Sequence, residues 1–343
     1  MAEKQTVLVT GASGFIAKHC IKKLLDEGYH VRASLRTPSR ADEVRAAVDP
    51  DGAAADRLSF VTLDLGSDKG WDEAMQGCAF VQHVASPFPP VEPENEDELI
   101  VPAREGALRA LHAAAKAGVK RVVLTSSVAA IAYGRTAQEE AAEQDRVFSE
   151  ADWSNPEGPI SAYAKSKTLA ERAAWDFIDS DEAGAMELAV INPGGVLGPL
   201  LDKQFSTSGQ IISRLLGGQV PACPRLNWSL IDVRDVADAH FEAMVRPDAA
   251  GKRFVLVADN AWMLDVSKAL ARAGFKTPVR QLPDFVLRLL AHFDKTMKMI
   301  VPGLGKQTRF DNTRLREGLG ITPRSVDDMA IAMAQTMRDY GAV

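Results

Sequence analysis

Short apolar runs alternate with amphipathic stretches along the first 260 residues. Apolar and β-branched runs, which predict strands, cover residues 7–10, 30–35, 58–63, 79–84, 119–125, 186–191, 230–233 and 254–257. Helical spacing of apolar residues predicts helices over residues 14–27, 103–117, 162–177 and 236–245. Strands that alternate with helices indicate a parallel sheet covered on both faces. We therefore predict an α/β fold, a Rossmann-type doubly wound parallel sheet.

The pattern becomes irregular after Pro193. We expect residues 1–193 plus 230–261 to form the dinucleotide-binding domain. Residues 194–229 plus 262–343 are expected to form a smaller, mainly helical C-terminal domain that binds the substrate. The apolar residues Trp228, Phe285 and Leu289 are expected in its core.

A glycine-containing turn joins the first predicted strand to the first predicted helix. It reads Gly11-Ala12-Ser13-Gly14-Phe15-Ile16-Ala17. Gly11 permits a tight turn, Gly14 lets the backbone approach a diphosphate, and Ala17 lets the helix lie close to the strand. The helix N-terminus offers free N–H groups and a positive dipole end to phosphate. The turn predicts dinucleotide binding, and the alternative is a tight turn that binds nothing.

The end of the second predicted strand bears on the choice of cofactor. A carboxylate there would bind the ribose hydroxyls of NAD, but this chain has Arg36, with Arg40 four residues on and no acid before Asp42. A guanidinium pairs well with a 2′-phosphate, which favours NADP(H). Alternatively, both arginines are surface charges. Asp64 and Leu65, at the end of the third strand, are placed to meet the adenine.

Tyr163 and Lys167 share one face of a predicted helix, and Ser126 and Ser127 end the fifth predicted strand. Ligands bind beyond the carboxyl ends of strands in such sheets. Carbonyl reduction needs a proton for the developing alkoxide, and a nearby ammonium makes a phenol a better acid. A serine hydroxyl donates to the same oxygen. We predict Tyr163 as acid, Lys167 as its cationic neighbour and Ser127 as hydroxyl donor, with Ser126 the alternate; otherwise these are packing or surface residues.

Composition excludes several classes of protein. The 343 residues are 46% apolar and 25% charged, which is typical of a folded chain and not of a disordered one. The formal charge of -6 gives no basic footprint for nucleic acid. No apolar run approaches the ~20 residues of a membrane helix, and no signal peptide precedes the glycine turn, so a cytoplasmic location is expected. Three scattered cysteines support neither a disulfide framework nor a metal site.

Several segments together resemble one family. They read GASGFIAKHCIKKLLDEGYHVRASLR, HVASPF, VVLTSSVAA, YAKSKTLAERAAWDF, INPGGVLGP and IDVRDVADAH. They look like an extended short-chain dehydrogenase/reductase. The most similar subgroup is the dihydroflavonol-reductase-like one, with plant cinnamoyl-CoA reductases and microbial NADPH-dependent aldehyde and ketone reductases. The resemblance is dense over residues 5–245 and thin after about residue 260.

The resemblance implies a full set of site residues. Its catalytic residues are Ser127, Tyr163 and Lys167. Those implied to bind the cofactor are Gly11, Ser13, Gly14, Phe15, Ile16, Arg36, Arg40, Asp64, Leu65, Ala85, Ser86, Tyr163, Lys167, Pro193, Val196 and Ser208. Those expected to contact the substrate are Phe88, Ser127, Tyr133, Tyr163 and Gly195. One departure is the Gly194-Gly195 pair, where relatives often carry bulkier residues, which suggests a roomier pocket.

The leading hypothesis is an NADPH-dependent reductase of an aldehyde or ketone with an aromatic or bulky apolar group, in which Tyr163 donates the proton. One alternative is a nucleotide-sugar epimerase or dehydratase, against which Arg36 argues. Another is a regulator that senses NADP without catalysis, against which the Tyr163–Lys167 pair argues. The expected partner is a small carbonyl compound, and both a monomer and a homodimer fit.

Overall fold

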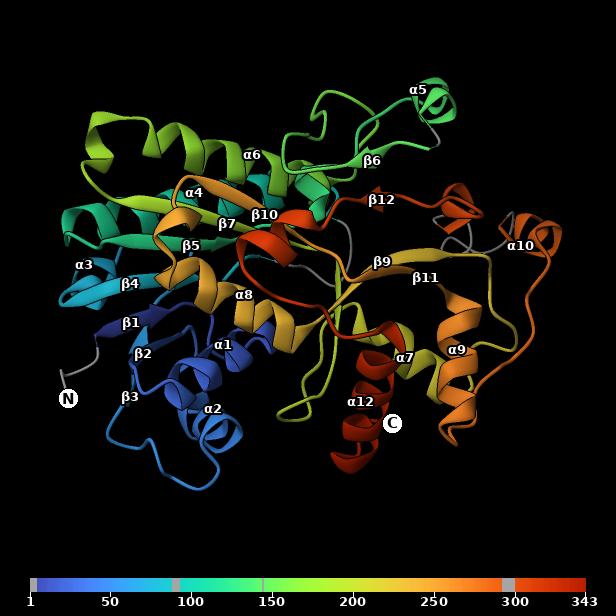
Figure 1. Ribbon diagram of the computed structural model, residues 1–343, viewed down its shortest axis with the longest axis horizontal. Coiled ribbons are helices and arrows are strands. Elements are labelled where there is room, and N and C mark those ends of the chain that lie inside the picture. The colour runs from blue at the N-terminus through green and yellow to red at the C-terminus, as the bar shows by residue number, and fades with distance from the viewer. Residues whose placement is uncertain (1–4, 88–92, 144, 292–299) are drawn as a thin grey trace.

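The computed structural model describes residues 5–87, 93–143, 145–291 and 300–343. Within these residues, seven strands form the main sheet in the order β10-β7-β5-β4-β1-β2-β3 (Figure 1). They are β1 (Thr6–Val9), β2 (His30–Leu35), β3 (Leu58–Thr62), β4 (Cys78–His83), β5 (Arg121–Thr125), β7 (Glu187–Pro193) and β10 (Lys252–Leu256). All their pairings are parallel. The strand order reverses beside β1, so the predicted doubly wound parallel sheet is confirmed.

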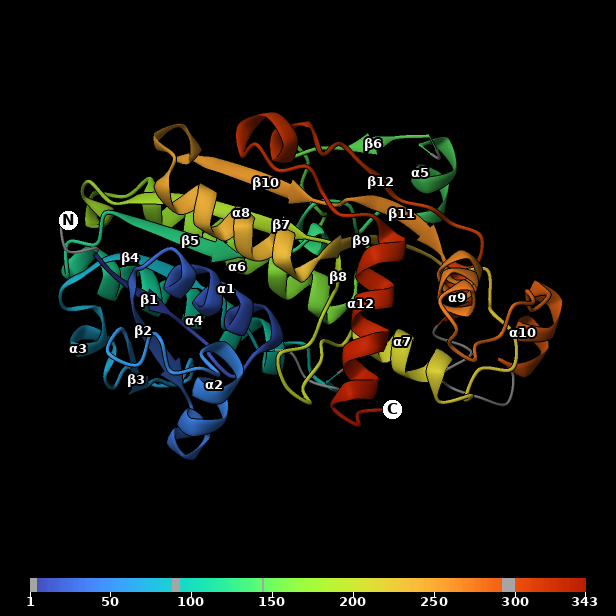
Figure 2. The same cartoon turned by 60° about the horizontal axis from the view of Figure 1, so that its bottom comes forward.

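Both faces of this sheet are covered by helices. Val7 and Val9 of β1 belong to a core cluster with α1 (Phe15–Asp26), α2 (Ala41–Val48) and α8 (Val233–Val245). Leu8, between them, belongs to a second cluster with α3 (Trp71–Met75), α4 (Asp97–Lys116) and α6 (Ala162–Ile178). Successive strand residues point to opposite faces, which is why a fully apolar run suits a strand buried on both sides. Figure 2 shows α1 and α8 on one side of the sheet and α4 and α6 on the other.

The rest of the chain combines helices with a small sheet. Strands β8 (Gly195–Leu197), β9 (Asn227–Asp232) and β11 (Asp259–Trp262) pair in the order β11-β9-β8. The helices are α5 (Ala137–Ala142), α7 (Gly209–Leu216), α9 (Met263–Arg272), α10 (Asp284–Leu290) and α12 (Val326–Asp339). The short strands β6 (Val147–Phe148) and β12 (Arg309–Phe310) also pair. This part is therefore mixed α/β, and not as purely helical as the sequence suggests.

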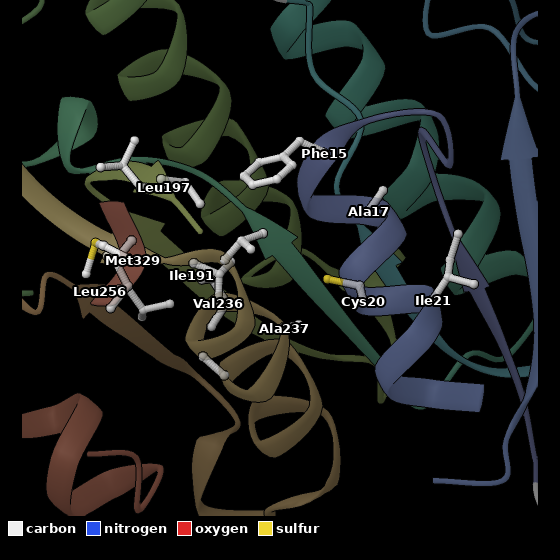
Figure 3. Close-up of a cluster of buried hydrophobic side chains, with 14 of the residues drawn as sticks. Phe15, Ala17, Cys20, Ile21, Ile191, Leu197, Val236, Ala237, Leu256 and Met329 are labelled. Carbon is white, nitrogen blue, oxygen red and sulfur yellow. The ribbon is translucent and has the colours of Figure 1, made fainter. Parts of the chain in front are cut away.

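The larger core cluster continues from the main sheet into this second part. It includes Cys20 and Ile21 of α1, Leu197 of β8 and Met329 of α12 (Figure 3). Of the elements around residues 230–261, β10 is a strand of the main sheet and α8 packs against that sheet. Strands β9 and β11 belong to the small sheet. The two parts of the chain thus share apolar contacts.

Some sequence expectations differ from the structure in their detail. Helix α4 begins at Asp97, before the expected start, and contains Pro102. Strand β7 continues through Pro193, two residues beyond the expected end of the strand. The expectation that Phe285 and Leu289 are core residues is wrong, because they are 72% and 63% exposed. Helix α10 buries Leu287 instead, and residues two positions away on a helix point to the opposite side.

No helix of the described residues combines the length and the apolar character that a membrane crossing requires.

Candidate active site

A cavity of about 870 Å³ opens at the carboxyl ends of the main-sheet strands. The segment after each of five strands contributes to its lining: Gly11 after β1, Arg36 after β2, Asp64 after β3, Ala85 after β4 and Ser127 after β5. This is where open parallel sheets bind their ligands, at the point where the strand order reverses. Its volume is in the range of pockets that hold cofactor-sized ligands.

Most of the predicted site residues line this one cavity. They are Gly11, Ser13, Gly14, Phe15, Ile16, Arg36, Asp64, Leu65, Ala85, Ser86, Ser127, Tyr163, Lys167, Pro193, Val196 and Ser208. Arg40, Tyr133 and Gly195 are described residues that are not among its lining. Phe88 lies outside the described residues. The binding roles of all these residues stay predictions.

The glycine turn has the shape that a diphosphate requires. Gly11 has a φ of 72°, and a Cβ at this position would lie 3.0 Å from the Ala85 Cα. The Gly14 N–H donates to the Gly11 carbonyl at 2.8 Å, which closes the turn immediately before α1. Because no side chain fills this space and the N-terminus of α1 adjoins it, the residues present fit a dinucleotide phosphate.

The two arginines near the end of β2 differ in their partners. Arg36 is exposed and lines the cavity. The Arg40 guanidinium instead donates to both carboxylate oxygens of Glu43, at 3.0 and 2.7 Å. A guanidinium held in this bidentate way has fewer donors available for a 2′-phosphate. Arg36 is therefore the better placed of the two for that group.

Asp64 contributes to the cavity from the loop after β3. Its carboxylate accepts the Gly66 N–H at 2.8 Å, and its backbone carbonyl accepts the Trp71 indole N–H at 3.3 Å. These contacts hold the loop in shape at the edge of the cavity.

The three predicted catalytic residues come together at the end of β5. Ser161 caps α6 by accepting the Ala164 N–H at 3.2 Å, and the helix then carries Tyr163 and Lys167 one turn apart. The Ser127 Oγ accepts the Ala129 N–H at 3.1 Å. The Ser127 Oγ–H donates to the Pro193 carbonyl at 3.4 Å, and the Ser127 side chain lies close enough to Tyr163 to act on the pKa of its phenol. A phenol, a hydroxyl and an ammonium thus surround one side of the cavity.

Burial controls the ionisation of these groups. It raises the pKa of Tyr163, while the hydrogen bond with Ser127 acts to lower it and the nearby Tyr133 to raise it. Burial lowers the pKa of Lys167 to about 8, and the carboxylate of Glu171 opposes this change. At neutral pH the phenol therefore keeps its proton and the ammonium is mostly charged. The lowering influence on the Tyr163 pKa comes from Ser127, where the sequence suggested Lys167.

Ser126 has a different partner from Ser127. Its hydroxyl donates to the buried carboxylate of Glu171 at 2.5 Å. Since this proton is committed to a carboxylate, the geometry favours Ser127 for contact with a bound carbonyl oxygen.

The Gly194-Gly195 pair has a structural reason. A Cβ at Gly194 would lie 2.4 Å from the Ser229 carbonyl oxygen, and one at Gly195 would lie 3.0 Å from the Leu230 side chain. Gly194 lies just before β8 and Gly195 is its first residue. The absence of side chains at both positions lets this strand lie close to β9. The roomier pocket expected from this pair stays a prediction.

Sequence reasoning missed the segment before α7. Gln204, Phe205, Ser206 and Thr207 line the cavity beside Ser208, and no regular pattern in the sequence marks them. Two contacts hold this segment against α1: the Lys18 ammonium pairs with Asp202, and the His19 ring bonds the Pro199 carbonyl at 2.9 Å. The helix that begins at the glycine turn therefore also positions the opposite wall.

Within the part of the chain that the structure describes, no group of three or more His, Cys, Asp or Glu side chains is arranged to hold a metal ion.

Comparisons with known proteins agree with this arrangement. A model of the NAD dependent epimerase/dehydratase family matches residues 7–258. The chain is 38% identical to the cinnamoyl-CoA reductase CAD2 of Medicago truncatula, over 81% of this chain and 82% of that protein. It is 34% identical to a putative NADPH-dependent methylglyoxal reductase, GRP2, of Candida albicans, over 82% and 86% of the two chains. The yeast methylglyoxal/isovaleraldehyde reductase Gre2, solved with NADPH, superposes with a TM-score of 0.79 at 28% identity, covering 98% of this chain and 100% of Gre2.

Proposed function

Because this chain belongs to the NAD dependent epimerase/dehydratase family of extended short-chain dehydrogenases/reductases, we propose that it is an NADPH-dependent carbonyl reductase. Its substrate would be an aldehyde or ketone with an aromatic or bulky apolar group. The observation that carries the proposal is the meeting of Ser127, Tyr163 and Lys167 in one cavity, which the glycine turn also lines. Relatives named as reductases of cinnamoyl-CoA and methylglyoxal support the reaction class.

Arg36 supports NADPH as the cofactor. It lines the cavity after β2, where NAD-binding proteins of this fold carry an acidic residue. The relatives described with NADPH agree with this choice. The same residue disfavours a nucleotide-sugar epimerase or dehydratase that holds NAD, the alternative within the family.

The side chains divide the work of reduction between them. When bound, the nicotinamide supplies the hydride. Tyr163, which burial keeps protonated, donates its phenolic proton to the carbonyl oxygen as that oxygen gains charge. The Ser127 hydroxyl donates a hydrogen bond to the same oxygen. We assign to the Lys167 ammonium, which lines the same cavity, the stabilisation of the phenolate that forms during the reaction, although Ser127 is the group that lowers the Tyr163 pKa in the unloaded site.

The Tyr163→Phe variant tests this assignment. It removes the proton donor and keeps the ring, so we expect the kcat for NADPH-dependent reduction to fall by about 10²–10⁴-fold. NADPH binding, followed by fluorescence titration, should change by no more than about threefold. Substrates would be a panel of aromatic and aliphatic aldehydes and ketones.

Tyr29→Phe is a matched control, because Tyr29 packs against Phe241 before the amino end of β2. It should retain wild-type activity. Full activity in Tyr163→Phe would exclude Tyr163 as the acid. No oxidation of NADPH by the wild-type protein with any of these carbonyl compounds would contradict the proposed function itself.

A further inference from the structure

Behind the catalytic residues lies an acid whose two oxygens are both engaged. Glu171 is fully buried on α6, one turn after Lys167. One oxygen accepts the Arg253 Nε–H at 2.5 Å, and the other accepts Ser126 Oγ–H at 2.5 Å and Asn192 Nδ2–H at 2.7 Å. A guanidinium, a hydroxyl and an amide are all donors, so this set suits an ionised carboxylate.

Arg253 is itself fixed in place. It lies on β10 with its side chain 8% exposed. Its Nη1 donates to the carbonyls of Glu150 at 2.9 Å and Asp152 at 2.7 Å, and its guanidinium lies 3.8 Å from the centre of the Trp153 ring. A cation held from several sides in this way gives Glu171 a rigid partner.

The same carboxylate connects to the catalytic serine through its other oxygen. Ser126 is the chain neighbour of Ser127, and Asn192 donates both to Glu171 and to the Ser127 carbonyl, the latter at 3.2 Å. The end of β5 is therefore tied to α6 through Glu171. A small cavity of about 20 Å³, the size of about one water molecule, is lined by Lys167, Glu171 and Ser126 together.

The titratable groups around Lys167 come from several elements. Glu171 from its own helix and His83 from β4 line the small cavity with Lys167, and Tyr163, one turn earlier on α6, lines the larger cavity with it. Burial lowers the pKa of His83 to about 4, so this ring is neutral at pH 7. The Arg253 cation lies behind Glu171 and is paired with it. Glu171 is thus the acidic group that acts on Lys167.

We propose that Glu171 is a positioning residue of this site, which keeps Lys167 cationic and holds the Ser126–Ser127 turn in place. The expected change in kcat rests on the proposed reductase function. The expected effect on Lys167 in the protein without cofactor does not.

The effect of removing the carboxylate has a definite sign. Burial lowers the pKa of Lys167 to about 8, and Glu171 raises it. In Glu171→Gln the opposing charge is lost, so the pKa of Lys167 falls further. Reduction declines as pH rises through the Lys167 pKa. The basic limb of the kcat–pH profile should therefore move to lower pH by about one unit in this variant.

Two readouts test the proposal. One is kcat against pH. The other is trace acetylation of Lys167 by acetic anhydride in the protein without cofactor, followed by mass spectrometry, because only the unprotonated amine reacts. In Glu171→Gln, both the basic limb and the midpoint of Lys167 labelling should lie about one unit lower than in the wild type. Glu171→Asp keeps the charge and should leave both near their wild-type positions while lowering kcat.

Glu187→Gln is the matched control. Glu187, at the amino end of β7, pairs with the buried Arg121 at 2.6 Å, so this variant also deprives a buried arginine of its carboxylate. The Glu187→Gln variant should be less stable, but neither the basic limb of its kcat–pH profile nor the midpoint of Lys167 labelling should move. An equal shift in Glu187→Gln, or no shift of the labelling midpoint in Glu171→Gln, would overturn the proposal.

Two further outcomes are decisive. If Glu171→Gln does not fold, Glu171→Asp decides, because its shorter side chain weakens the hold on Ser126 and Asn192. Wild-type kcat together with wild-type labelling in Glu171→Asp would then overturn the positioning role. Absence of NADPH-dependent reduction in the wild type with a shifted labelling midpoint in Glu171→Gln would refute the reductase and uphold the effect on Lys167.

Discussion

At the scale of single residues, two residues of the same type have different roles because their neighbours differ. Arg36 faces the cavity, whereas Arg40 is held by Glu43. The hydroxyl of Ser126 is committed to Glu171, whereas that of Ser127 meets Tyr163. Neighbouring residues of one type therefore need separate assignments.

Replacing each arginine by alanine tests this difference. Arg36→Ala should raise the KM for NADPH by about 10–100-fold, the loss of one or two charge-assisted hydrogen bonds, and leave the KM for NADH nearly unchanged. Arg40→Ala should have a smaller effect, because its guanidinium is engaged with Glu43. Steady-state kinetics with both cofactors measures this. An equal rise for NADPH and NADH in Arg36→Ala would refute a 2′-phosphate contact.

The sequence predicts those site residues whose chemistry depends on local spacing. Gly11 and Gly14 stand between a strand and a helix, and Tyr163 and Lys167 lie one helical turn apart. The role of Glu171 depends on side-chain partners, one of which is 82 positions away in the chain. No periodic pattern carries that information.

At the scale of elements, α1 does two things at once. Its N-terminus follows the glycine turn, and its first turns hold the segment that carries Phe205 and Ser208 through the Lys18–Asp202 and His19–Pro199 contacts. The cofactor side and the opposite wall of the cavity are thus attached to one rigid helix.

Asp202→Asn should loosen this attachment. Lys18 is 1% exposed, and burial already lowers its pKa, an effect that Asp202 opposes. Loss of the partner should cost about 2 kcal/mol of unfolding free energy. It should also raise the KM for the carbonyl substrate several-fold, because the wall moves.

Asp26→Asn is the comparison, since its pair with Lys22 is exposed on the same helix. There we expect a change below about 0.5 kcal/mol and unchanged kinetics. Thermal unfolding and steady-state kinetics measure both effects. Identical behaviour of the two variants would contradict a role for Lys18–Asp202 in shaping the cavity.

The strands of the main sheet are predictable because each is a short apolar run, and segments with the apolar spacing of a helix separate many of them. The small sheet is less so, since β8 has three residues and β9 pairs in parallel with β8 and antiparallel with β11. Strands this short, paired in both directions, leave little pattern in the sequence.

At the scale of the whole molecule, three buried histidines make stability depend on pH. Burial lowers the pKa of His19 and His83 to about 4 and that of His240 to about 3. The unfolded value is near 6.5. Below pH 6.5 the unfolded chain therefore binds protons that the folded protein does not. The free energy of unfolding thus decreases as the pH is lowered.

Urea unfolding between pH 7 and pH 4.5 measures this. Each histidine should remove up to about 1.4 kcal/mol of unfolding free energy per pH unit below 6.5. Histidine-to-glutamine replacement at His240 should make the decline less steep, whereas the same change at the half-exposed His112 should not. Equal stability at pH 7 and pH 5 in the wild type would contradict neutral burial of these rings.

The continuous core cluster of Figure 3 bears on how the chain could be altered. Met329 and Met333 of α12 belong to the same cluster as Leu197 of β8 and Val236 of α8. A chimera that exchanged the C-terminal third for that of a relative would bring new side chains against the helices of the main sheet. The C-terminal part of this chain is therefore not a separable module: grafting it would require matched repacking of the apolar cluster that α8, β8 and α12 share.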